Sequence, residues 1–92
     1  MELTGVIKVI GETQTFGNNG FKKRELVITT TEEYPQMIPI EFVKDKEELL
    51  DLFSVGQKVK VGINLGGREW VNPEGVSKYF LSVKGWKIEE TA

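Results

Sequence analysis

Residues 54–70 read SVGQKVKVGINLGGREW, and the alternation of their side chains predicts a β-strand. One face carries only apolar residues: Val59, Val61, Ile63 and Leu65. The other face carries lysine, glycine and asparagine, and this period of two is typical of a half-buried strand. The glycines favour sites where a small barrel bends or where another backbone comes close. Arg68 and Trp70 end the stretch, so we expect a planar cation and a large aromatic ring at the mouth of a loop.

Four more strands are predicted around this one, at residues 2–14, 21–31, 36–43 and 78–88. The first has apolar residues on both faces, which suits a long bent strand that serves two sides of a barrel. The turn FGNNG at residues 16–20 follows it, because an Asn-Gly pair readily takes the positive φ of a hairpin tip. The side chains expected to face the core from the second and third strands are Leu26, Ile28, Ile38, Ile40 and Phe42.

One short helix is predicted between the third and fourth strands. Asp45 and Glu48 make a capping-box-like pattern at its start. Its apolar stripe consists of Leu49, Leu50 and Phe53. Because this stripe needs burial while the opposite face is acidic, we expect the helix to close one end of a barrel.

A loop is predicted over residues 66–77, where proline and glycine supply turn residues. In the last strand the apolar side chains change face after Gly85, from odd-numbered positions to Trp86 and Ile88. Such a change of parity indicates a β-bulge. We expect Phe80 in the core, and Trp86 in the core or at a subunit interface.

Three strands, one helix and two strands in this order form the layout of the OB fold. This fold is a five-stranded Greek-key barrel, and a helix commonly closes the gap between its third and fourth strands. We therefore predict an all-β protein with a single OB-fold domain over residues 1–92. An SH3-like barrel is the main alternative, but it lacks a helix at that point.

The residue types present narrow the chemistry. The 92 residues are 39% hydrophobic and 28% charged, which is ordinary for a soluble globular chain. The sequence has no cysteine and no histidine, so disulfides, thiolate nucleophiles, Cys-based zinc sites and the commonest general base are excluded. No apolar run approaches the roughly 20 residues of a membrane span. We expect a cytoplasmic protein that is not an enzyme, has no cofactor or metal and does not contact membranes.

The net charge of −2 conceals an uneven distribution. Residues 20–29 have a balance of +2, and residues 56–88 carry six cations against two acids, a balance of +4. The rest of the chain therefore carries −8, since −2 − 2 − 4 = −8. An acidic chain can thus present a basic groove, although the simpler interpretation is a solvated surface.

The segments VGQKVKV (55–61) and REW (68–70), followed by Lys78 and Tyr79, resemble the single-stranded DNA-binding (SSB-type) OB domains. The chain resembles still more closely a small uncharacterised bacterial family of that type. That likeness rests on the opening MELTG, the KKRE strand, the Tyr34-Pro35 turn and the closing KGWKI. The resemblance implies single-stranded DNA as the partner.

OB barrels bind single strands across their second and third strands, between the first–second and fourth–fifth loops. Such binding needs cations that follow phosphates and flat side chains on which bases stack. The residues of those regions that supply both, and that we predict to bind nucleic acid, are Phe21, Lys22, Lys23, Arg24, Arg68, Trp70, Lys78 and Tyr79. For Trp70, packing of the ring on the end of the barrel is the alternative. The choice between DNA and RNA stays open, because 2′-hydroxyl contacts depend on geometry.

The alternative function is an oligomeric protein-interaction or assembly module without a nucleic-acid role. OB barrels often associate through strand edges or outer faces. The apolar residues expected on such a face are Val6, Ile10, Val27 and Met37. Because a lone barrel of this size has a thin core, we expect a homo-oligomer, most simply a dimer.

Overall fold

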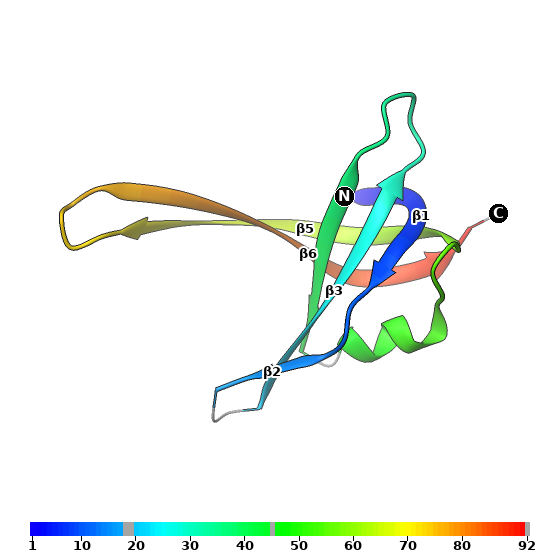
Figure 1. Cartoon of the computed structure of the whole chain (residues 1–92), viewed down its shortest axis with the longest axis horizontal. Helices are drawn as coiled ribbons and strands as arrows, with labels where there is room; N and C mark the ends of the chain where they lie inside the picture. Colours follow the sequence, from blue (N-terminus) through cyan, green and yellow to red (C-terminus); the bar gives the residue numbers. More distant parts are fainter. Residues whose placement is uncertain (18–19, 45, 92) are drawn as a thin grey trace.

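The strands close into a small barrel from which one long hairpin projects (Figure 1). The computed structural model describes residues 1–17, 20–44 and 46–91. Its elements are β1 (Glu2–Ile10), β2 (Gln14–Phe16), β3 (Phe21–Thr30), β4 (Met37–Val43), the 3-10 helix η1 (Lys46–Leu52), β5 (Lys58–Val71) and β6 (Ser77–Glu90). This order confirms the predicted all-β OB-type fold with one short helix between its third and fourth long strands.

The ring of strands is closed because β1 pairs with two neighbours. The strand order is β1-β5-β6-β4-β3-β2, and β1 also pairs with β3. All of these pairings are antiparallel except that of β4 and β6, which meet in parallel at Glu41 and Lys84. The five long strands form the barrel, and β2 extends it only beside β3.

The predicted first strand, residues 2–14, is divided in the structure. β1 ends at Ile10, and β2 pairs with β3 alone. A register shift between Ile7 and Val9 changes the pairing of β1 with β3. Ile10 consequently packs against the core, so the prediction that it lies on an outer apolar face is wrong.

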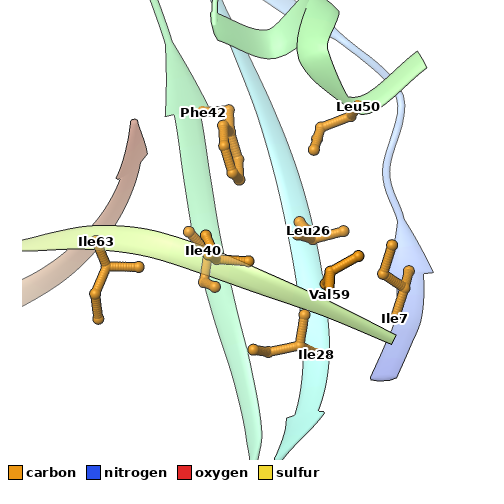
Figure 2. Close-up of a cluster of buried hydrophobic side chains, with 9 residues drawn as sticks. Ile7, Leu26, Ile28, Ile40, Phe42, Leu50, Val59 and Ile63 are labelled. Atoms are coloured by element: carbon orange, nitrogen blue, oxygen red, sulfur yellow. The ribbon is translucent and has the colours of Figure 1, made fainter. Parts of the chain in front are cut away.

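The core is a single cluster of buried apolar side chains at the crossing of the long strands and η1 (Figure 2). Its members are Ile7, Leu26, Ile28, Ile40, Phe42, Leu50, Val59, Val61 and Ile63. The inward faces predicted for the second, third and fourth strands are therefore confirmed, with Ile38 partly buried beside them and with one exception: Leu65 is exposed, because β5 has left the barrel there. Gly85 belongs to this region because a Cβ there would clash with the Phe42 ring.

The helix η1 packs over one end of the barrel through its apolar side. Leu50 is fully buried, and Phe53 packs against the core just after the helix. Its predicted cap Asp45 lies outside the described residues, as do Asn18 and Asn19 of the predicted turn. Within the described part of the chain, no helix is long and apolar enough to cross a membrane.

The predicted loop over residues 66–77 is wrong, because most of it is paired β-structure. β5 continues to Val71 and β6 begins at Ser77, so only a short turn joins them. The Asn72 side-chain oxygen closes this turn by accepting from the N–H groups of Glu74 and Val76, each at 2.9 Å. We call residues 64–71 and 77–84 the arm; it is the hairpin that leaves the barrel in Figure 1.

Candidate nucleic-acid interface

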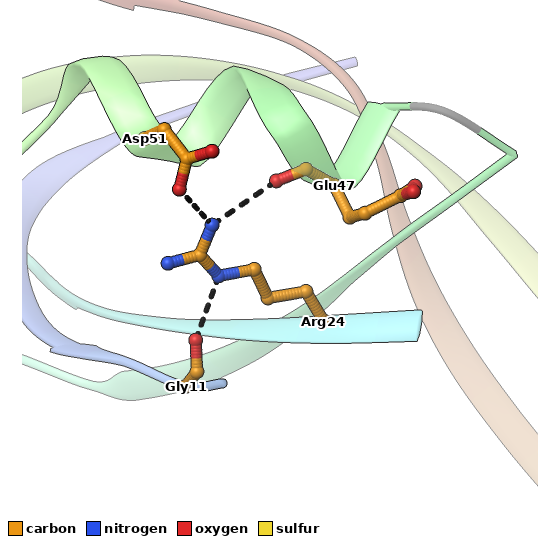
Figure 3. Close-up of polar contacts among 4 residues, drawn as sticks. All are labelled: Gly11, Arg24, Glu47 and Asp51. Carbon is orange, nitrogen blue, oxygen red and sulfur yellow. Dashed lines mark hydrogen bonds and ion pairs between the residues drawn. The ribbon is translucent and has the colours of Figure 1, made fainter. Parts of the chain in front are cut away.

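Arg24, predicted to bind phosphate, is mostly buried and makes its polar contacts within the protein (Figure 3). Its Nε–H donates to the Gly11 carbonyl at 2.7 Å, and Nη1 donates to the Glu47 carbonyl at 3.3 Å. Nη1 also pairs with Asp51 Oδ1 at 2.6 Å. The Arg24 side chain is only 16% exposed. It therefore ties β3 to η1 and to the segment after β1, and we do not include it in the interface.

The outer face of β3 and β4 has little free positive charge. Lys23 Nζ lies 2.8 Å from Glu41 Oε1, so an acid on β4 balances this cation. Glu25 stands opposite Glu41 in the ladder, which adds a second carboxylate to the same face. Phe21 and Lys22 are exposed at the start of β3. Because phosphates are repelled by carboxylates, this face suits a nucleic acid less well than the sequence predicted.

The arm places three of the predicted residues on one face. Arg68 pairs with Phe80 across the ladder, and Trp70 pairs with Lys78. The Arg68 guanidinium lies over the Phe80 ring, 5.3 Å from its centroid. Trp70 is 47% exposed, so its ring is not buried against the end of the barrel. Arg68, Trp70 and Lys78 thus share the outer face of the arm with Phe80, whose predicted core position is wrong.

Tyr79 lies on the opposite, inner face of the arm. It pairs with Glu69, and its side chain is 75% exposed. This face continues the inward side of β5 beyond the barrel, since strand residues two apart share a face. Its exposed apolar side chains are Leu65, Val71 and Leu81. The structure therefore places Tyr79 on the opposite face of the arm from Arg68, Trp70 and Lys78.

The cations of residues 56–88 lie on one outer face of β5 and β6, from the barrel to the tip of the arm. They are Lys58, Lys60 and Arg68 on β5, and Lys78, Lys84 and Lys87 on β6. We call this face, with its aromatic side chains, the basic strip. The two acids of the segment lie elsewhere, Glu69 on the inner face and Glu74 in the turn, whereas Glu2 and Glu89, outside the segment, lie beside Lys60 and Lys87. Of these cations only Arg68 and Lys78 are among the residues predicted to bind nucleic acid, although the even spacing of Lys58, Lys60 and Arg68 in the sequence already places them on one face.

Trp86 also belongs to the basic strip. It is 47% exposed and its ring lies over Gly62, so it is not in the core, and the other predicted position, at a subunit interface, stays a prediction. The predicted bulge is confirmed by the register shift between Gly62 and Ile63. Ile88 returns to the core side beyond the bulge.

The described residues do not form a group of three or more His, Cys, Asp or Glu side chains that could hold a metal ion.

Two small hollows flank β3. One is lined by Gly11, Glu12, Gln14, Lys23 and Glu25, and the other by Gly20, Phe21, Lys22, Lys44 and Glu47. In the second, Glu47 is buried and its Oε2 has no hydrogen-bond partner among the described residues.

Comparison with known proteins agrees with the fold. The chain superposes on a crystal structure of the mitochondrial single-stranded DNA-binding protein Rim1 from S. cerevisiae with a TM-score of 0.69. That alignment covers 98% of this chain and 91% of the other at 15% sequence identity, which shows a shared fold. No curated protein matches the chain. The family model described as "Domain of unknown function (DUF3127)" matches residues 2–89, and the chain therefore belongs to that family.

Proposed function

We propose that the protein binds single-stranded nucleic acid, with DNA as the expected species, along the basic strip of β5 and β6. One observation carries this proposal: the cations of residues 56–88 share a single face with exposed aromatic rings, while Glu69 and Glu74 lie elsewhere and Glu2 and Glu89 lie at the barrel end of that face. The SSB-like fold supports the same function.

The chemistry of the strip suits unpaired bases. Phosphates need cations along their path, and each unpaired base gains about 1–3 kcal/mol from stacking on an aromatic side chain. Arg68 and Lys78 supply charge beside the rings of Phe80 and Trp70 on the same ribbon. A duplex hides the faces of its bases, so exposed rings favour single strands.

The first experiment measures binding of labelled oligo-dT and oligo-U by fluorescence anisotropy at two salt concentrations. We expect binding at low salt that weakens steeply as salt rises, because phosphate contacts release counterions. Lys46 on η1 provides a matched control, since Lys46→Ala removes an exposed cation that lies outside the strip. Equal losses for Lys46→Ala and Lys78→Ala would contradict the proposed location.

A second candidate function is an assembly module, and the inner face of the arm favours it. Leu65, Leu81 and Val71 are more than half exposed there, at 54%, 72% and 52%. Val27 and Met37 present further apolar surface on the outer face of the barrel. We keep the proposal of a homo-oligomer, most simply a dimer, and light scattering that finds a monomer at high concentration would contradict it. An apolar interface between copies would respond little to salt, which distinguishes it from binding of phosphates.

A further inference from the structure

We infer that Trp86 is a base-stacking platform at the barrel end of the basic strip. A bound single strand would then run lengthwise along β5 and β6, and not across β3 and β4. This inference rests on the proposed function and adds to it a contact residue and a path. It starts from the position of one exposed indole ring.

The Trp86 ring lies flat on the backbone of Gly62. A Cβ built on Gly62 would stand 2.9 Å from Cε2 of the ring, 3.0 Å from Cζ2 and 3.1 Å from Nε1. In the indole ring, Cε2 is bonded to both Cζ2 and Nε1. If the Cβ built on Gly62 lay in the plane of the ring, beyond its edge, it would be nearer to Cζ2 and Nε1 than to Cε2. The nearly equal distances therefore place Gly62 beneath the face of the ring. The residue is nevertheless 47% exposed, so a large part of its surface remains open to solvent while Gly62 supports one face of the ring.

The bulge and two glycines, Gly62 and Gly85, explain the exposed position of Trp86. The register shift sets both Trp86 and Lys87 opposite Gly62, whereas Gly85 pairs with Ile63. On the inward side, the space beside Gly85 is filled by the Phe42 ring. The bulge therefore directs the indole outward, and the missing side chain at Gly62 gives it a flat support.

The surroundings of Trp86 fit a nucleic acid better than an apolar protein partner. Its neighbours on this face are Lys60, Lys84 and Lys87, together with two acids: Glu2 pairs with Gly62 in the β1–β5 ladder, and Glu89 pairs with Lys60 in the β5–β6 ladder. The ion pairs of two of these lysines, Lys60 with Glu2 and Lys87 with Glu89, are both 3.9 Å long and exposed. Exposed pairs of this kind contribute only about 0–1 kcal/mol, so a phosphate can replace the carboxylate at little cost.

The strip has the length of a single-strand site. From Lys78 to Trp86, β6 advances by eight residues, or about 26 Å at the usual rise of a strand. OB-fold proteins occupy roughly 4–16 nucleotides per barrel. A strand that stacks on Trp70 near the tip can therefore reach Trp86 once the oligonucleotide is long enough.

The experiment uses the fluorescence of Trp86 itself. Trp70→Phe leaves Trp86 as the one tryptophan of the chain, and Trp86→Phe leaves Trp70 as the matched control. Each protein is titrated with oligo-dT of roughly 4, 8 and 16 nucleotides, while anisotropy of a labelled oligonucleotide reports binding independently. We expect quenching of Trp86 upon binding, increasing with oligonucleotide length. Gly62→Ala, whose methyl group displaces the ring, should weaken that quenching.

Affinity gives a second readout. Trp86→Ala should weaken binding of the longest oligonucleotide by about 5- to 150-fold, the range that corresponds to one lost stack. Trp86→Phe should retain most of the affinity. If Trp70→Phe binds the oligonucleotide but Trp86 fluorescence does not change, the inference is overturned and the proposed function stands. If the wild-type protein binds no oligonucleotide at low salt, the proposed function is overturned and this inference with it.

Discussion

The guanidinium of Arg68 lies over the ring of Phe80, 5.3 Å from its centroid, on the strand paired with its own. Exposed cation–π contacts contribute about 0.5–1 kcal/mol, so this contact orders both side chains on the arm. A charge for phosphate and a ring for a base are thereby held next to each other.

Removal of one strip cation should weaken binding similarly for all base sequences. For Arg68→Ala or Lys78→Ala we expect the slope of log affinity against log salt to fall in magnitude by about 0.7, the value for one phosphate contact on a single strand. Anisotropy titrations over a range of salt concentrations measure this slope. An unchanged slope in both variants would show that neither cation contacts a phosphate.

Trp70→Ala should cost about 1–3 kcal/mol of binding free energy and leave the salt slope nearly unchanged, because stacking releases few counterions. Tyr79→Ala is the matched control, since Tyr79 is an exposed aromatic residue on the inner face of the arm. It should leave affinity unchanged. Equal losses in the two variants would argue that the faces of the arm do not differ in binding.

Leu50→Ala should lower the free energy of unfolding by about 2–5 kcal/mol, as truncation of a buried leucine does. Leu50 is fully buried where η1 meets the barrel. Chemical denaturation monitored by circular dichroism measures the loss. Binding of the oligonucleotide at low temperature should persist, because the strip lies on β5 and β6 and not on η1. A variant that unfolds like wild type but no longer binds would contradict the structural role of η1.

Arg24→Ala should destabilise the fold and leave the binding surface intact. Hydrogen bonds that involve a charged group typically contribute about 1.5–3 kcal/mol, and we expect a loss of unfolding free energy in this range. Lys22→Ala, at an exposed position two residues earlier, is the control and should unfold like wild type. If Arg24→Ala unfolds like wild type but binds more weakly, the result would contradict the structural role of Arg24 and support the phosphate contact predicted from the sequence.

The barrel was predictable because its signals are local. The alternation of Val59, Val61 and Ile63 indicated both a strand and its inward face, and burial of all three confirms it. The Leu49-Leu50 pair indicated a helix that covers apolar surface, and Leu50 is buried.

The arm was not predictable from the same local signals. Gly66 and Gly67 favoured a loop, but their pairing with Ser82 and Leu81 keeps them in the ladder. Such pairing depends on residues far along the chain, which local propensity does not describe. The buried position of Arg24 was not predictable for the same reason, since its partner Asp51 lies on another element, far along the chain.

The most direct test of the account is a titration of the wild-type protein with labelled oligo-dT, in competition with unlabelled duplex DNA of equal length. At low salt we expect the protein to bind the single strand, and the duplex to compete poorly because its bases cannot stack on the rings of the strip. The affinity should fall linearly with salt on logarithmic axes. Failure to bind oligo-dT at low salt, or equally strong competition by the duplex, would contradict the claim that the basic strip is a site for single strands.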